Sequence, residues 1–234
     1  MVEISDICST LGTIFSFLLS FTPLFPFIKV FKKEEKIDIL PEGLLIFLIL
    51  TRLVWGSVWI LTKRKIPTFN SISGIIICDI FVFLYFYLYF NRNYIKTIIA
   101  SSLLLLIEIL ILYFEILWGN HDVLSLIAMV FNLLMFVSPW QKILKVFAEK
   151  NHNLIPIYTT IINILCSISW MAYGVCINSV PQIIPNVLGF FLSTVNAATW
   201  GYYFFNRNKL RKYKKVFEKV KEKEKENETE LVEK

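Results

Sequence analysis

The sequence predicts an all-α membrane protein in which seven transmembrane helices form two parallel three-helix repeats joined by a linker helix (3+1+3). Three observations predict this fold. Of the 234 residues, 56% are hydrophobic, against about 45–50% in soluble domains. The apolar residues gather in blocks of roughly the 20 residues that a helix needs to cross a bilayer. Landmarks of the first half also recur in the second. Because lipid offers backbone groups no hydrogen-bond partners, such blocks are expected to be helices.

Short charged loops separate the seven expected spans. The spans are Ile7–Phe31, Leu40–Thr62, Thr68–Phe90, Thr97–Trp118, Val123–Phe147, Leu154–Ile177 and Pro181–Phe205. They divide the chain into a first three-helix unit (1–93), a linker transmembrane helix (94–121), a second three-helix unit (122–205) and a charged cytoplasmic tail (206–234).

The lysines and arginines of the short loops predict the orientation, because they favour the cytoplasmic side of a membrane. With the N-terminus outside, the basic loops around Lys32, Arg92 and Lys145 all face the cytoplasm. The outer side then receives only the cluster 63–65. We expect the N-terminus outside, the C-terminus in the cytoplasm and residence in the plasma membrane. No cleavable signal peptide is expected, because residues 1–6 carry two acidic residues and no basic one.

An internal repeat underlies the predicted architecture. Each unit has a proline inside its first span and a proline at the start of its second span. A tryptophan stands fourteen residues beyond the proline of the second span. Each unit also has a glycine near the end of its second span. The paired landmarks are Pro23 and Pro139, Pro41 and Pro156, Trp55 and Trp170, and Gly56 and Gly174. Three helices per unit would invert the second unit, so the single span between the units restores its direction.

Three segments of the second half carry a family resemblance: FNLLMFVSPWQKILKVFAEKN, IPIYTTIINILCSISWMAYG and IPNVLGF. They resemble the SWEET family of sugar transporters, and the first half matches the spacing of that family but departs at several residues. The resemblance covers essentially the whole folded length, and the family belongs to the parallel-repeat transporters. It implies facilitative, bidirectional transport of a small sugar by alternating access, without ion coupling or a cofactor, in a homo-oligomer.

Four prolines are candidate hinges. A proline within a span frees a carbonyl and bends the helix. The resemblance implies a hinge role for Pro23, Pro41, Pro139 and Pro156, while the alternative is a set of static kinks.

An aromatic face and a side-chain amide are the groups that a sugar site needs, for the C–H face of the ring and for its hydroxyls. Trp170 and Asn186 supply them, and the resemblance implies that these positions line the pocket between the units. In the first half Arg52 stands opposite Trp170 and Ser71 opposite Asn186, with Asn70 as a substitute for Ser71. A bulky residue at Trp170 implies a monosaccharide, such as glucose.

Arg52 departs from the small residue that the family has at this place. An arginine at membrane depth is costly and usually faces a wet cavity or a counter-ion. Two interpretations stay open: a structural pair with Asp79, or a cationic pocket that favours an acid-bearing solute.

A glycine pair with its aromatic neighbours and two acidic residues of the fourth span are further candidates for a functional role. The resemblance makes Tyr173-Gly174 and Trp55-Gly56 an outer gate, although a close helix contact at glycine is an equally good explanation.

Two acids of the fourth span, Glu108 and Glu115, lie seven residues apart and therefore share a face. We expect them to face the first unit or a neighbouring subunit rather than to relay protons.

Other functional classes lack their sequence features. No Walker A loop, metal-ligand spacing or nucleophile motif is present, so we expect no enzyme, no catalytic residue, no metal and no cofactor. The expected partners are a small-molecule sugar and membrane lipid, with no nucleic acid. The alternatives are a PQ-loop-like carrier of an amino acid or organic anion, and a seven-helix receptor, which predicts no repeat.

Overall fold

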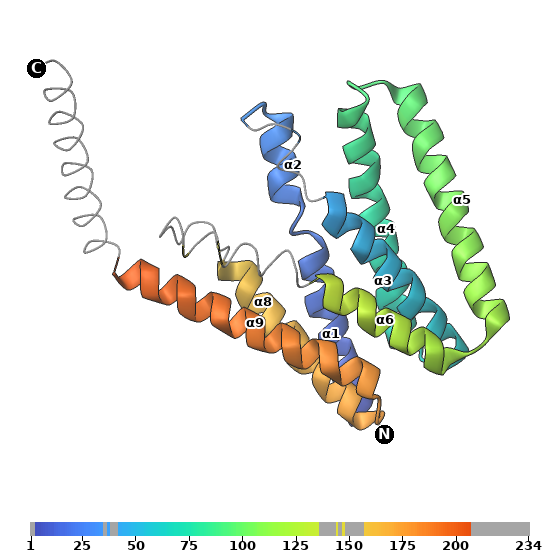
Figure 1. Cartoon of the computed structure of the whole chain (residues 1–234), viewed down its shortest axis with the longest axis vertical. Coiled ribbons are helices and arrows are strands. Elements are labelled where there is room, and N and C mark those ends of the chain that lie inside the picture. The colour runs from blue at the N-terminus through green and yellow to red at the C-terminus, as the bar shows by residue number, and fades with distance from the viewer. Residues whose placement is uncertain are drawn as a thin grey trace, which may run out of the picture.

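The computed structural model describes residues 3–34, 37, 42–135, 144, 147 and 157–206. This part of the chain contains helices, turns and loops but no strand (Figure 1). Its helices are α1 (Ile4–Ser20), α2 (Leu24–Phe31), α3 (Glu42–Leu61), α4 (Lys65–Tyr89), α5 (Tyr94–Trp118), α6 (His121–Met135), α8 (Ile157–Cys176) and α9 (Val180–Phe205).

The helices coincide with the predicted spans. Within the described residues, five segments are long and apolar enough to cross a membrane, and the first of them, Ile4–Phe31, joins α1 and α2. The other four are α4, α5, α8 and α9, while Leu45–Leu61 and His121–Met135 are shorter apolar helices. The predicted all-helical, multi-pass fold is thus confirmed. Most of the residues between α6 and α8 lie outside the described part.

The helices form two similar units whose contacts are reciprocal. In the first unit α4 packs on α1 and α3, and in the second α9 packs on α6 and α8. Between the units, α1 packs against α8 and α6 packs against α3. The first helix of each unit therefore lies against the second helix of the other, as expected for repeats related by a two-fold axis. The predicted repeat is confirmed at the level of helix packing.

The linker helix α5 lies on the first unit and makes both units parallel. It packs against α3 and α4, and its chain direction brings α6 back to the end of the molecule that carries the N-terminus (Figure 1). Ser57 Oγ on α3 donates a hydrogen bond of 2.6 Å to Glu115 Oε2 on α5. The Glu108 carboxyl group lies beside that of Asp79 on α4. Both acids of α5 thus face the first unit, as predicted.

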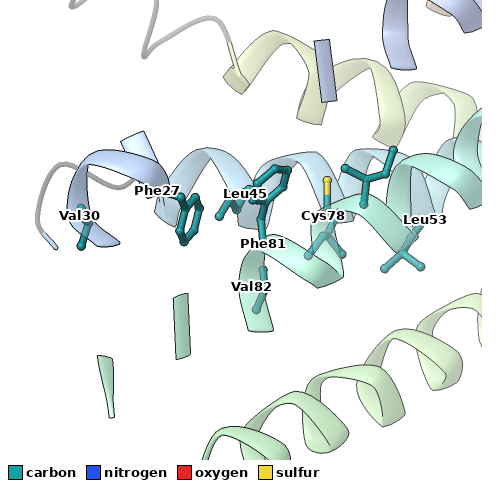
Figure 2. Packing of buried hydrophobic residues seen from close by; sticks show 9 residues of the cluster. Phe27, Val30, Leu45, Leu53, Cys78, Phe81 and Val82 are labelled. Carbon is teal, nitrogen blue, oxygen red and sulfur yellow. The ribbon is translucent and has the colours of Figure 1, made fainter. Parts of the chain in front are cut away.

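Two apolar clusters hold the bundle together. The first joins α2 to α3 and α4, and Figure 2 shows its side chains, among them Phe27 stacked on Phe81 with ring centroids 5.4 Å apart. The second, which we call the interface cluster, lies between the two units. It consists of Val54, Trp55, Val58, Trp59, Leu124, Ala128, Cys166, Trp170 and Tyr173. The interface cluster contains most of the aromatic residues that the sequence singled out.

Candidate functional site

The buried face of α1 is made only of small residues. Its buried positions are Ser5, Ser9, Gly12, Ser16 and Ser20. They recur every three or four residues and therefore form one face of the helix. Small residues let membrane helices approach closely, and this face is where α1 meets α8. The sequence analysis missed it, although the spacing of serine and glycine in the first span was a readable signal.

Trp170 fills the space that Gly12 leaves. A Cβ atom added at Gly12 would lie 2.8 Å from Cε2 of the indole. The indole Nε1 donates a 2.8 Å hydrogen bond to Ser16 Oγ, and Ser16 Oγ lies 3.3 Å from Cys166 Sγ. The Trp170 side chain is only 7% exposed. The predicted pocket residue therefore lies in the interface between the units, with its N–H group satisfied by the first unit.

Four aromatic rings from α3 and α8 contact one another in sequence across the interface between the units. Trp55 stacks on Trp59 at 4.9 Å, Trp59 meets Tyr173 edge-on at 5.9 Å, and Tyr173 meets Trp170 at 5.6 Å. The structure thus brings the two predicted gate aromatics, Trp55 and Tyr173, into one cluster. Trp59 is a member that the sequence analysis did not select. The Tyr173 hydroxyl is buried and has no hydrogen-bond partner among the residues that the structure describes.

The two glycines of the predicted gate differ in how closely they are packed. A Cβ atom at Gly174 would lie 2.9 Å from Ile183 Cγ1 and 3.2 Å from Gln182 Cβ. At Gly56 the nearest atom would be Ser71 Cβ at 3.5 Å, an ordinary van der Waals distance. Gly174 is therefore a close contact between α8 and α9, whereas Gly56 has room for a methyl group.

This difference predicts unequal effects of the same substitution. We expect Gly174→Ala to lower the stability of the protein by about 1–3 kcal/mol, the usual cost of overpacking. The matched control Gly56→Ala should stay within about 0.5 kcal/mol of the parent. Thermal unfolding of both variants in detergent measures the difference. Equal midpoints for the two variants would contradict the packing argument.

The side chain of Arg52 on α3 contacts α4 of its own unit and lies near α8 of the second unit. Its guanidinium lies over Gly74, where a Cβ atom would be 2.8 Å from Nε, and Nη1 donates a 3.2 Å hydrogen bond to the carbonyl of Asn70. The guanidinium also lies close enough to Cys78 and Cys166 to interact electrostatically with both thiols. Because Cys166 belongs to α8, this interaction connects Arg52 of the first unit with the second unit.

Of the two interpretations of Arg52, the structural pair with Asp79 is not formed in the structure. Within the described part of the chain, the one ion pair joins His121 to Asp122. Helix geometry gives the reason: Gly74 and Cys78 are four residues apart and share the face of α4 that meets Arg52, whereas Asp79 is rotated by about 100°. Asp79 therefore points to α5 and lies beside Glu108.

The predicted amides and the predicted serine lie on α4 and α9. Asn70 and Ser71 are 7% and 1% exposed, so both are buried in the first unit. Asn186 is half-buried on α9, and its Nδ2 donates a 2.7 Å hydrogen bond to the carbonyl of Gln182. The structure joins Arg52 to Asn70, but the hydrogen bond that it gives Asn186 stays within α9.

Of the four candidate hinges, only Pro23 belongs to the described residues. It stands between α1, which ends at Ser20, and α2, which begins at Leu24. Across this break the 21–23 segment makes turn-type bonds, such as Thr22 N–H to the carbonyl of Leu19 at 3.0 Å. The first span is thus interrupted at the predicted place. Pro41, Pro139 and Pro156 lie outside the described residues.

Comparison with known proteins gives consistent matches. Residues 122–210 match a family model described as a sugar efflux transporter for intercellular exchange. The sugar transporter SWEET1 of Dictyostelium discoideum is 28% identical over 154 residues, which cover 63% of this chain and 70% of the relative. The bidirectional sugar transporter SWEET10 of Arabidopsis thaliana is 24% identical over 201 residues, which cover 82% and 68%.

A solved structure has the same fold. The structure of a eukaryotic SWEET transporter superposes with a TM-score of 0.73 at 20% sequence identity, over 86% of this chain and 97% of that one. The family model matches only the second unit, whereas this superposition covers both units and the linker helix. Together, the family model, the relatives and this shared fold support a relationship of the chain to the SWEET family.

Proposed function

We propose that this protein is a facilitative, bidirectional carrier that moves a small sugar, a monosaccharide such as glucose, across a membrane by alternating access. The observation that carries the proposal is the reciprocal interface between the units, with Trp170 at its centre. An interface in which each unit contributes the same pair of helices has two alternative openings, one toward each side of the membrane.

The side chains that the sequence selected carry groups that suit a sugar. Trp170 offers an aromatic face to the C–H side of a pyranose ring. The amides of Asn70 and Asn186 can both donate to and accept from hydroxyls, and Ser71 adds a hydroxyl. In the packed state Trp170 is held by Ser16 and Gly12. Opening the interface would free this indole for a ring of similar size, which favours a monosaccharide over a disaccharide.

We infer the moving parts from the packing. Residues 1–93 and 122–205 would tilt as two bodies about the four prolines, and the break at Pro23 supports a hinge there. The aromatic cluster containing Trp55 and Tyr173, with Gly56 and Gly174 behind it, would be the gate at the N-terminal end. The packing of these rings against one another supports a carrier that is closed at that end.

The membrane setting is also part of the proposal. The loop between α3 and α4, with Lys63 and Arg64, lies at the same end of the bundle as the N-terminus, whereas the loop between α4 and α5 lies at the other end (Figure 1). This second loop carries Arg92, and Lys96 follows it in the first turn of α5. The excess of basic residues on the side away from the N-terminus supports an outer N-terminus and a cytoplasmic C-terminus. We place the carrier in the plasma membrane as a homo-oligomer that needs no cofactor.

Transport by purified protein tests this function. We expect the full-length chain in liposomes to equilibrate labelled glucose in both directions without any ion gradient. Labelled sucrose should enter at most about one tenth as fast, because Trp170 occupies the space that a second ring needs. Uptake that collapsed on dissipating a proton gradient, or equal rates for glucose and sucrose, would contradict the proposal. Protein-free liposomes supply the background rate.

One observation supports a second candidate, a carrier of an organic anion or amino acid. Arg52 lies near Cys166 of the second unit, and its one side-chain hydrogen bond in the described part of the chain goes to a backbone carbonyl rather than to a carboxylate. A half-buried cation that has no counter-ion among the described residues attracts a carboxylate of the solute. A labelled amino acid and a sugar acid therefore belong in the same uptake panel.

A further inference from the structure

We propose that Cys8 and Cys176 form a redox-controlled disulfide that locks the two units together at the N-terminal end. The α1–α8 contact that sets Gly12 against Trp170 and Ser16 against Cys166 brings Cys8 to the end of α8 that carries Cys176. Both thiols are reduced in the structure. Cys8 belongs to α1 of the first unit, and Cys176 is the last residue of α8 in the second. Because α1 packs against α8, a bond between these residues would cross the interface that the carrier must open.

A disulfide at this position would affect transport because the two cysteines lie beside the aromatic rings of the proposed gate. Cys8 packs against the interface cluster, and Cys176 follows Tyr173 by three residues and thus lies about one turn farther along α8. Opening the gate requires α1 and α8 to separate at this end. A covalent link would hold the closed arrangement and stop transport until it is reduced. This effect rests on the proposed carrier function.

Exposure makes the pair reactive, whereas the other cysteines are enclosed. Cys176 is exposed and Cys8 is partly exposed, while Cys78 and Cys166 are buried. With the N-terminus outside, the pair faces the oxidising side of the membrane, where disulfides persist. The opposite orientation would place the two thiols in a reducing compartment, where the disulfide would not form.

The chemistry needs a two-electron oxidant, and a low-molecular-weight disulfide such as oxidised glutathione supplies it. The thiolate of Cys176 attacks one sulfur of glutathione disulfide, breaks its S–S bond and releases one glutathione. The thiolate of Cys8 then attacks Cys176 Sγ in the mixed disulfide and releases the second glutathione. Two protein thiols become one disulfide, and the two electrons and two protons leave in the two glutathione molecules.

The test uses the full-length protein in liposomes, reduced and then exposed on both sides to oxidised glutathione. We expect mass spectrometry to find a peptide linked through Cys8 and Cys176, and glucose uptake to fall about tenfold as the open state is removed. Dithiothreitol should restore uptake. The matched variant Cys176→Ser, altered at an exposed position, should keep its uptake under the same oxidant. Absence of the linked peptide, or its presence with unchanged uptake, would overturn the proposal.

A second measurement separates this proposal from the transport function. If the reduced protein moved none of the solutes, the carrier proposal would fail, and hydrogen exchange would then decide on the lock. Oxidation should slow the exchange of backbone amides at the N-terminal ends of α1 and α9 and at the end of α8 in the parent but not in Cys176→Ser. Unchanged exchange in the parent would overturn the lock.

Discussion

Replacing Trp170 by alanine should lower glucose uptake about tenfold or more, because the sugar loses its aromatic face, an interaction of roughly 1–2 kcal/mol. The same change removes a large buried side chain that fills the space over Gly12. Truncation of a buried Trp typically costs about 3–5 kcal/mol, so the midpoint of thermal unfolding should fall as well. Uptake per correctly folded molecule, quantified by size-exclusion chromatography, is the measurement.

Two milder substitutions separate binding from packing at this site. Trp170→Phe keeps an aromatic face but loses the N–H group that Ser16 accepts, so its uptake should stay within about threefold of the parent. Ser16→Ala removes the same hydrogen bond from the other side and should behave like Trp170→Phe. If Trp170→Ala transported glucose with the parental KM and rate, the indole would have no part in the solute site.

Replacing Arg52 by glutamine should shift the preference between a neutral sugar and a sugar acid of the same size. Arg52 lies near Cys166 of the second unit, and its side chain has no carboxylate partner in the described part of the chain. Removing its charge should raise the ratio of glucose uptake to glucuronate uptake about tenfold or more, since about 1.4 kcal/mol of attraction for the carboxylate is lost. Competition between the two labelled solutes measures this ratio directly.

The choice of glutamine keeps the rest of the contact intact. Its amide can still donate to the Asn70 carbonyl and lie over Gly74, where the guanidinium packs. Arg52→Lys retains the charge and should leave the ratio within about threefold of the parent. An unchanged ratio in Arg52→Gln would mean that the guanidinium does not face the solute in either open state, and would remove the case for an anionic substrate.

The positions of the spans and the repeat followed from the sequence because they depend on local composition. A helix in lipid must be apolar along its whole length, so each block shows its own limits. The paired prolines, tryptophans and glycines recur because the same unit occurs twice, as the reciprocal contacts of α1 with α8 and of α6 with α3 confirm. The face of α5 that carries Glu108 and Glu115 was likewise readable from helical spacing.

Partners across the interface depended on the tertiary structure. Sequence spacing places Asp79 in the span next to that of Arg52, yet rotation about α4 directs Asp79 toward α5 and leaves Arg52 over Gly74. Neither the fit of Trp170 over Gly12 nor the meeting of Cys8 with Cys176 could be read from the chain, because each joins residues more than a hundred positions apart. A helix face that contacts lipid and one that contacts protein have similar apolar compositions. Only the packing of the helices therefore decides which neighbour a given face contacts.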